Sequence, residues 1–305
     1  MRWGRVSALV TTVALVAGLG TGLAGCRLPT STSGRPTVVA GFYPLYFVAE
    51  RVAGRYNDVV DLTPPGVEPH EYELTVRQVA KVDEARVGLY LEGIAPSIDQ
   101  AMVNDSPEHR LEVSTVVPLM APAAGYGEET AAAKDPHFWQ DPVLLGQVAV
   151  AFAATMADAD PAHAAYYRAQ GQRLVGDLHA LDRDYARGLA SCRIRTVVVS
   201  HDAFEYLARR YHLDVVPIAG LEPDAEPSLS RLHDLASLVQ ERGVTTIFFE
   251  TLATPDLARS LASDTGVKTA VLDPIEGLSS ADPNATYLTL MRQNLAALTK
   301  ANQCS

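Results

Sequence analysis

Three of the eight histidines in the sequence lie where an imidazole could bind a ligand. His70 lies in a turn-rich loop just after an extended apolar run, His137 in a loop bracketed by prolines, and His201 at the end of a β-branched run at 196–200. In open α/β sheets, ligands bind beyond the carboxyl ends of the strands. Because imidazole nitrogen is a common ligand of transition metals, these three histidines predict a metal site.

Carboxylates are available to complete such a site. Asp273 and Glu250 each follow a strand-like apolar run, so both are expected at the ligand-binding edge of a sheet. A carboxylate beside a ligating imidazole can also accept a hydrogen bond from its second ring nitrogen and fix its orientation. We interpret Glu250 as such a partner or a reserve ligand, together with three acidic neighbours of the histidines, Glu68, Glu71 and Asp141. Asp135 is a further acidic neighbour, and Asp202 is interpreted as a helix N-cap.

Three imidazoles and one carboxylate form a donor set of three nitrogens and one oxygen. This set suits one tetrahedral Zn²⁺ per chain better than Mg²⁺ or Ca²⁺, which prefer oxygen ligands. Mn²⁺ also favours oxygen donors and is the less suitable ion. The spacing alone is only moderately specific, because the candidates are scattered along the chain and no His-Glu-x-x-His helix is present. The alternative interpretation is that the histidines are incidental.

The other five histidines lie in contexts that predict no metal role. His109 is expected in a loop, and His212 at the end of a helix, where a cation is mildly favoured. His163, His179 and His233 are expected on helices.

Apolar runs alternate with amphipathic segments along the chain and predict strands and helices in turn. The expected strands cover 37–41, 59–62, 87–91, 196–199, 215–218, 245–249 and 269–272. The expected helices cover 46–53, 75–85, 95–103, 202–211, 228–242, 255–264 and 287–300. This alternation predicts an α/β fold with parallel sheets in two lobes.

A segment rich in helix formers between the two halves predicts one long helix. Asp160 is a candidate N-cap and Pro161 a candidate first helical residue. A helix from there to about residue 189 would be roughly 43 Å long. We interpret it as a rigid connector between the lobes, the alternative being a surface helix of a single large domain. The expected domains are an N-terminal α/β lobe at 37–158, a connecting helix at 159–190 and a C-terminal α/β lobe at 191–305.

The first 25 residues have the features of an export signal. Arg2 and Arg5 precede an uncharged apolar stretch at 6–20, and Leu-Ala-Gly-Cys follows at 23–26. We interpret 1–25 as a signal peptide and Cys26 as a lipid-modified N-terminus, followed by a flexible tether over 26–36. The alternative is an ordinary signal peptide with an incidental cysteine.

Two cysteines remain after Cys26, namely Cys192 and Cys304. An exported protein meets an oxidising compartment, so we predict one disulfide between them. Two buried free thiols are the alternative.

Composition excludes several classes of protein. The chain of 305 residues is 48% hydrophobic and 20% charged, which argues against disorder. The net charge of −11 disfavours electrostatic binding to nucleic acid. Only the N-terminal apolar stretch approaches membrane-spanning length, so contact with a membrane is expected through the lipid anchor alone.

Together, several motifs resemble those of the metal-binding solute-binding proteins of ABC uptake transporters, in the zinc and manganese group. The resemblance covers essentially the whole mature chain. Besides the lipid-attachment motif, it rests on Gly-Val-Glu-Pro-His-Glu-Tyr-Glu at 66–73, Asp-Pro-His-Phe-Trp-Gln-Asp-Pro at 135–142, Ser-His-Asp-Ala-Phe-Glu-Tyr-Leu at 200–207, Glu-Pro-Asp-Ala-Glu-Pro-Ser at 222–228 and Leu-Asp-Pro at 272–274.

The resemblance implies two lobes joined by one long helix, with the metal in the cleft between them. It also implies four ligands: His70, His137, His201 and Asp273. Many zinc-binding members carry a long histidine-rich loop before the second ligand motif, but residues 121–134 contain no histidine here. Either this loop is a plain lid, or another protein, a metallochaperone, delivers the metal.

The function expected from these features is extracytoplasmic capture of Zn²⁺ and its delivery to the membrane permease of an ABC transporter. We expect a monomer that is exported and lipid-anchored at the outer face of the cytoplasmic membrane. One alternative is a mononuclear zinc hydrolase, which needs three protein ligands and an open position for water. The other is a metal-independent adhesin or scaffold lipoprotein.

Overall fold

The structure is a computed structural model in which residues 34–104, 107–122, 134–223 and 225–305 are described. The predicted signal peptide, Cys26 and most of the tether lie outside the described residues, as does most of the loop at 121–134. The residues from Arg35 to Ser305 form one compact unit.

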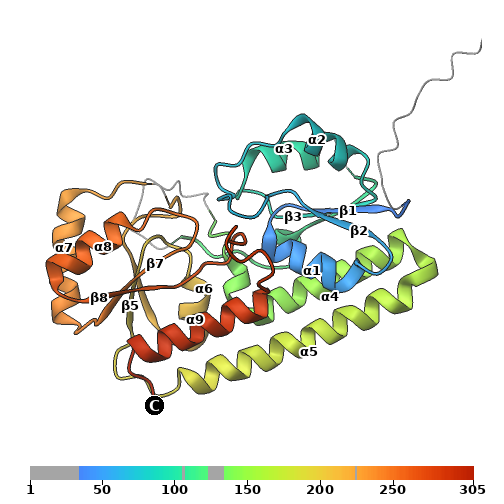
Figure 1. Cartoon of the computed structure of the whole chain (residues 1–305). Helices are drawn as coiled ribbons and strands as arrows, with labels where there is room; N and C mark the ends of the chain where they lie inside the picture. Colours follow the sequence, from blue (N-terminus) through green and yellow to red (C-terminus); the bar gives the residue numbers. More distant parts are fainter. Residues whose placement is uncertain (1–33, 105–106, 123–133, 224) are drawn as a thin grey trace, which may run out of the picture. The chain divides into compact units, whose positions relative to one another are not determined.

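This unit contains two sheets, each made of four parallel strands (Figure 1). The strand order is β2-β1-β3-β4 in the N-terminal sheet and β6-β5-β7-β8 in the C-terminal sheet. The strands are β1 Thr37–Ala40, β2 Asp58–Asp61, β3 Val87–Tyr90, β4 His109–Glu112, β5 Thr196–Val199, β6 Asp214–Pro217, β7 Thr246–Phe249 and β8 Lys268–Val271. The predicted fold class, two parallel-sheet α/β lobes with one long helix, is confirmed.

The inner strands are short apolar runs, as strands covered by helices on both faces require. In β1, Val38 and Val39 are fully buried, and Val38 pairs with Val59 on one side and Val87 on the other. The edge strand β4 is different. It begins at His109, which was expected in a loop, because three polar residues and a single leucine carry no recognisable strand pattern.

Helices cover the sheets and connect the strands, as expected for right-handed βαβ units. They are α1 Tyr43–Ala53, α2 Val76–Asp83, α3 Pro96–Asn104, α4 Pro142–Ala159, α5 Ala164–Gly188, α6 Glu205–Tyr211, α7 Leu229–Glu241, α8 Asp256–Thr265 and α9 Tyr287–Ala301. The helix α4 is long and apolar enough to cross a membrane by length and composition, but half of it is buried. Its apolar surface packs on α1 and α5.

The long helix α5 begins later than the sequence predicts. Pro161 opens a short 3-10 turn, Pro161–His163, and the α-helix starts at Ala164. Asp160 does not cap the backbone; its carboxylate instead contacts the Nδ1 atom of His163 at 2.7 Å and accepts a hydrogen bond from the Tyr167 hydroxyl at 2.7 Å. The 25 residues of α5 span about 37 Å.

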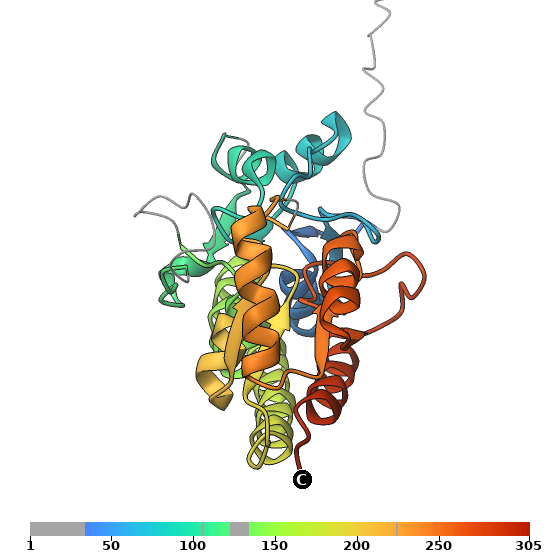
Figure 2. The ribbon, with the colours of Figure 1, turned by 90° about the vertical axis from the view of Figure 1, so that its left-hand side faces the viewer.

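Both lobes pack on α5, which runs beneath them in Figure 1. Helix α1 of the N-terminal lobe contacts α5, and Arg51 pairs with Asp177 across that contact at 2.6 Å. Helix α9 lies beside the C-terminal end of α5 (Figure 2), where the Tyr185 hydroxyl donates to the carbonyl of Met291 at 2.6 Å. The helix therefore links the lobes, as a connector would.

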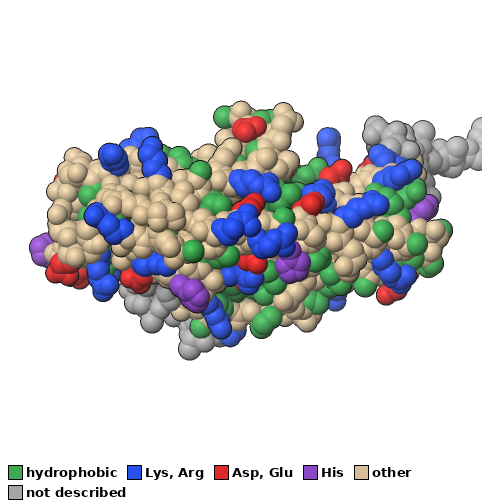
Figure 3. All heavy atoms as spheres, turned by 90° about the horizontal axis from the view of Figure 1, so that it is seen from below, with side chains coloured by type: hydrophobic (Ala, Val, Ile, Leu, Met, Phe, Trp, Pro, Cys, Tyr) green, Lys and Arg blue, Asp and Glu red, His purple; other side chains and the backbone are tan. Residues whose placement is uncertain are grey.

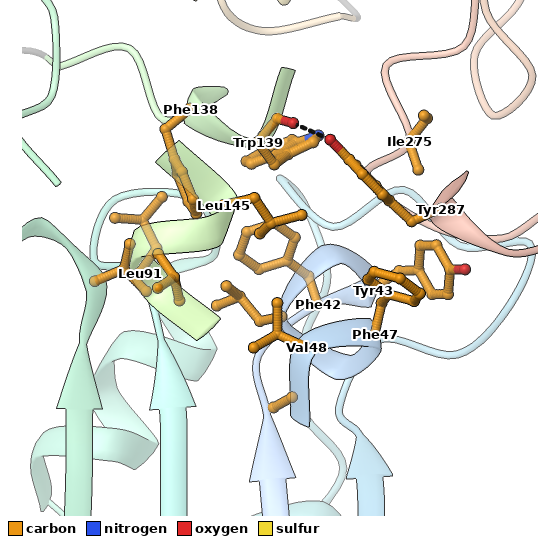
Figure 4. Packing of buried hydrophobic residues seen from close by; sticks show 14 of the residues in the cluster. Phe42, Tyr43, Phe47, Val48, Leu91, Phe138, Trp139, Leu145, Ile275 and Tyr287 are labelled. Carbon is orange, nitrogen blue, oxygen red and sulfur yellow. Dashed lines mark hydrogen bonds between the residues drawn. The ribbon is translucent and has the colours of Figure 1, made fainter. Parts of the chain in front are cut away.

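The hydrophobic core also continues from one lobe to the other. Figure 4 shows Tyr287 of α9 against Trp139 and the α1 residue Phe47. The Tyr287 hydroxyl donates to the carbonyl of Trp139 at 2.5 Å, and the Trp139 indole N–H donates to the carbonyl of Pro274 at 2.7 Å. At the far end of the C-terminal lobe, the predicted disulfide between Cys192 and Cys304 is confirmed.

Candidate metal centre

Three imidazoles converge on one carboxylate oxygen between the two lobes. The Oε1 atom of Glu276 lies 2.9 Å from Nε2 of His137, 3.2 Å from Nε2 of His201 and 3.8 Å from Nε2 of His70. All four side chains are almost completely removed from solvent. The three histidines predicted from the sequence are therefore brought together, although they lie far apart along the chain.

The donor atoms form two groups that share Glu276, namely His70, His137 and Glu276, and His201, Glu250 and Glu276. The distances from the shared oxygen suit a tetrahedral ion. Nitrogen and oxygen ligands about 2.0–2.1 Å from a tetrahedral Zn²⁺ lie about 3.3 Å from one another. The three distances from Glu276 Oε1 to the imidazole nitrogens scatter around that value. The donor set of three nitrogens and one oxygen is the set expected for zinc.

Two of the imidazoles are held by a second carboxylate on their other ring nitrogen. Nδ1 of His137 lies 2.8 Å from Oδ1 of Asp135, and Nδ1 of His201 lies 2.9 Å from Oε1 of Glu250. A hydrogen bond donated from Nδ1 fixes the ring and directs Nε2 toward the centre. Glu250 thus lies where the sequence placed a supporting carboxylate, whereas Asp135 supports His137 from two residues away.

His70 is held differently, through its backbone. Its loop leaves β2 and meets the loop after β8, where the Gly66 N–H donates to the carbonyl of Leu278 at 2.6 Å. Gly66 has a φ of +86°, which favours glycine, and a Cβ on Gly277 would lie 3.1 Å from the carbonyl oxygen of Val67. These contacts clasp the two loops together. Among the residues that the structure describes, the acid nearest to Nδ1 of His70 is the exposed Glu222, at 3.9 Å.

The expected fourth ligand, Asp273, makes other contacts in the structure. One of its carboxylate oxygens accepts a hydrogen bond from the Ile275 N–H at 2.8 Å, and the other accepts one from the Thr251 hydroxyl. Ile275 has a φ of +62°, which a β-branched residue rarely adopts. Asp273 therefore shapes a strained turn that carries Glu276 inward, and no cluster of possible metal ligands among the described residues includes it.

The remaining acidic candidates have other environments. Asp141 caps α4 by accepting from the Val143 N–H at 2.8 Å and pairs with Arg210 at 3.2 Å, so it acts in the helix rather than at the metal centre. Glu71 is exposed. Burial raises the pKa of Glu68 to about 7, although the neighbouring His70 opposes that rise.

Asp202 was expected to cap a helix, but α6 begins three residues later, at Glu205, with Phe204 at its N-cap. Asp202 is instead fully buried, and its N–H donates to the carbonyl of Gly220 at 3.0 Å.

Electrostatics make the centre a tightly coupled unit of opposite charges. Burial by itself disfavours the charged form of His137, yet hydrogen bonds to Asp135 and Glu276 raise its pKa to about 9. The pKa of His201 is likewise raised well above its usual value, because Glu250 and Glu276 outweigh its burial. Burial would raise the pKa of Glu276, but the facing imidazoles hold it well below its ordinary value.

Glu276 is the residue of the candidate centre that the sequence did not predict, and Asp135 was expected only as an acidic neighbour of His137. Glu276 lies in the same loop as Asp273, between the end of β8 and Gly277, so the rule that ligands gather beyond strand ends applies to both acids. Asp135 precedes His137 by two residues, and its side chain also accepts from the His137 backbone N–H at 2.9 Å. That spacing is typical of an acid that organises its own loop.

The chain is similar in sequence and fold to known zinc-binding proteins. Residues 38–301 match the family described as zinc-uptake complex component A, periplasmic. The high-affinity zinc uptake system protein ZnuA of Bacillus subtilis is 34% identical over 274 residues, which cover 86% of each chain. The zinc-binding lipoprotein AdcA of Streptococcus pneumoniae is 33% identical over 90% of this chain and 58% of its own length.

Solved structures agree with these relatives. The Zn(II)-bound ZnuA-like domain of Streptococcus pneumoniae AdcA superposes with a TM-score of 0.75 at 31% identity, over 88% of this chain and 99% of that one. The laminin-binding protein of Streptococcus agalactiae, described as bifunctional with adhesin and metal transporting activity, gives a TM-score of 0.78 at 31% identity. This similarity covers 87% of this chain and 99% of the laminin-binding protein.

Proposed function

Because the chain belongs to the periplasmic zinc-uptake complex component A family, we propose that it binds one Zn²⁺ outside the cytoplasm and delivers it to an ABC-transporter permease. It acts as a solute-binding protein rather than as an enzyme. The zinc ion is its cargo. A mononuclear hydrolase would keep one of four positions open for water, and here a fourth protein donor faces the three imidazoles.

We assign His70, His137, His201 and Glu276 as the ligands. The observation that carries this assignment is the convergence of three Nε2 atoms on a single carboxylate oxygen in a buried centre. Burial excludes competing water and strengthens the attraction between the cation and the carboxylate. Asp135 and Glu250 keep two of the rings oriented, so little ordering is left to accompany binding.

The ligands come from both halves of the chain, and this provides a route for the release of zinc. His70 and His137 belong to the N-terminal half of the chain, and His201 and Glu276 to the C-terminal half. Any movement that separates the two halves divides the donor set into pairs. Two donors hold Zn²⁺ far more weakly than four, so a permease that pulls the halves apart would receive the ion.

Three imidazoles favour Zn²⁺ over Mn²⁺, since manganese binds preferentially to oxygen donors. The chain acts as a monomer tethered through lipid on Cys26 to the outer face of the cytoplasmic membrane. The loop at 121–134 contains no histidine, so zinc reaches the centre directly or from a metallochaperone.

Metal analysis and competitive titration test the proposal. Protein purified without added metal and then exposed to Zn²⁺ should bind one ion per chain. Glu276→Gln should weaken binding about 100-fold or more, as expected for loss of a charged ligand in a buried site. Asp273→Asn, the matched change in the same loop, should weaken it far less. A stoichiometry of zero, or equal losses in the two variants, would contradict the assignment.

A further inference from the structure

The solvent-facing side of α5 carries a row of arginines that zinc binding does not use. Counted at 3.6 residues per turn, Arg168, Arg173, Arg183 and Arg187 all fall on the half of the helix opposite its buried residues. All four are exposed, and together they extend along about 28 Å of the helix. Ala169, Gly176 and Ala180 lie between them on this side, together with the polar residues Gln172 and His179.

Neighbouring helices enlarge this basic face. Arg292 and Lys300 are exposed on α9, a helix with no acidic residue. Figure 3 shows lysine and arginine side chains spread over this side of the molecule, with acidic ones scattered among them. The chain as a whole carries a net charge of −11, so this basic face means that charge is distributed unevenly over the surface.

The acids of α5 are already paired. Asp177 binds Arg51 at 2.6 Å, and Asp184 binds Arg187 at 2.6 Å with Arg292 at 3.8 Å. In contrast, Arg168, Arg173 and Arg183 form no ion pair or hydrogen bond through their side chains with any residue that the structure describes. Their charges are therefore available to an external partner.

The end of the predicted tether lies beside this face. Arg35, where the compact unit begins, donates to the carbonyl oxygens of Gly54 and Arg55 at 3.4 and 3.1 Å. The guanidinium of Arg55 lies over the ring of Tyr166 on α5, 5.9 Å from its centroid. A lipid on Cys26 would thus hold Arg35, beside the N-terminal end of α5, within about 30 Å of the bilayer, the reach of the tether fully extended.

We propose that this basic face, made by Arg168, Arg173 and Arg183 with Arg292 and Lys300, docks on the anionic phospholipid surface of the membrane that anchors the chain. The inference rests on the proposed lipid anchor but not on zinc binding. Each basic residue near an anionic bilayer adds electrostatic attraction to the hydrophobic attraction of the lipid anchor. The lipid on Cys26 would tether the protein, and the basic face would orient it on the membrane. None of the four assigned metal ligands belongs to the basic face, so docking would not place the metal centre against the membrane.

Vesicle sedimentation tests the proposal with the chain from Arg35 to Ser305, which keeps both sheets and the whole core. Vesicles of phosphatidylglycerol and phosphatidylcholine should bind it at low salt, and pure phosphatidylcholine vesicles should not. High salt should release it, because ions screen such contacts. Arg168→Gln/Arg173→Gln/Arg183→Gln should lower the partition coefficient about tenfold or more. Glutamine maintains helix propensity, so the variant should fold.

The matched control removes the same charge elsewhere. Arg77→Gln/Arg242→Gln/Arg259→Gln, changed at three exposed positions off α5, should bind vesicles within about twofold of the unchanged chain. Both triple variants should bind zinc normally, which separates this proposal from the metal site, and vesicles should not slow zinc binding. Equal binding to neutral vesicles, equal losses in the two variants, competition by soluble glycerol phosphate at matched phosphate concentration, or zinc binding blocked by vesicles would each overturn the proposal.

Discussion

Zinc binding should release protons even at neutral pH, because His137 and His201 hold protons tightly when no metal is bound. In the structure, both ring nitrogens of His137 face carboxylates, as do both ring nitrogens of His201. Each ring can donate on both sides only when it is protonated. The pKa of His137 is raised to about 9, and that of His201 is raised well above its usual value. Zn²⁺ can occupy the Nε2 positions only after those two protons leave.

The expected number follows from these pKa values. At pH 7 a group with a pKa of about 9 is almost fully protonated, so His137 and His201 should together release about two protons per Zn²⁺. Two ordinary imidazoles would release only about half a proton at that pH. With two protons exchanged, zinc affinity should fall about 100-fold for each unit by which pH is lowered below 7.

Calorimetric titration of zinc in buffers of different ionisation enthalpy measures the proton count directly. Glu276→Gln removes the negative charge that both rings share, so its count should fall clearly below two. Asp273→Asn changes a carboxylate that does not face the rings, and its count should remain about two. A count below one for the unchanged chain at pH 7, or an affinity that is flat between pH 7 and 6, would refute the electrostatic description of the centre.

The raised pKa of His137 also predicts how the stability of the metal-free protein changes with pH. A histidine whose folded pKa lies above its unfolded value stabilises the fold below the unfolded pKa, and this stabilisation is lost as pH rises through the folded pKa. For His137 the window runs from about 6.5 to about 9. Asp61, whose pKa burial raises to about 8, acts in the same direction. Differential scanning calorimetry should therefore show a lower Tm at pH 9 than at pH 6.5 without metal, and an unchanged or higher Tm at pH 9 would contradict this.

Three further predictions concern individual side chains. The ring of Trp139 lies 5.3 Å from that of His137, so zinc should change its fluorescence, and a response of equal size in His137→Ala would place the ion elsewhere. The bridge between Cys192 and Cys304 joins residues 112 apart, so replacing both by serine should lower the free energy of unfolding by about 2–5 kcal/mol, as urea denaturation would measure; an unchanged midpoint would contradict this. In a titration with equal free Zn²⁺ and Mn²⁺, zinc should occupy the site almost alone, and His201→Ala should narrow that preference; equal occupancy by manganese would contradict the nitrogen-rich donor set.

Much of the fold follows from local patterns in the sequence. The inner strands β1, β3 and β5 are compact β-branched or apolar runs, and each was expected within about one residue of where it lies. Edge strand β4 was not predicted because Leu111 is its only apolar residue, so its sequence shows no alternation. The start of α5 shifted because Asp160 binds side chains rather than free backbone N–H groups, a choice that depends on the tertiary position of Tyr167.

The residues of the metal centre could also be predicted only in part. The three histidines could be predicted because each lies in a loop with a distinctive local sequence near a strand end. The choice between Asp273 and Glu276 could not, since both acids follow β8 within five residues. That choice is made by the backbone at Ile275, whose positive φ turns Glu276 inward, and by Thr251, which occupies one oxygen of Asp273. Neither the dihedral angle nor the long-range hydrogen bond leaves a local signal in the sequence.

An anomalous difference map tests whether His70, His137, His201 and Glu276 bind Zn²⁺, using a crystal of the zinc-loaded protein measured on both sides of the zinc absorption edge. The map should contain one peak per chain, about 2.0–2.1 Å from Nε2 of each histidine and from a carboxylate oxygen of Glu276, with Asp273 still bonded within its turn. A peak coordinated by Asp273 in place of Glu276, a peak away from the three imidazoles, or no peak at all would contradict this assignment.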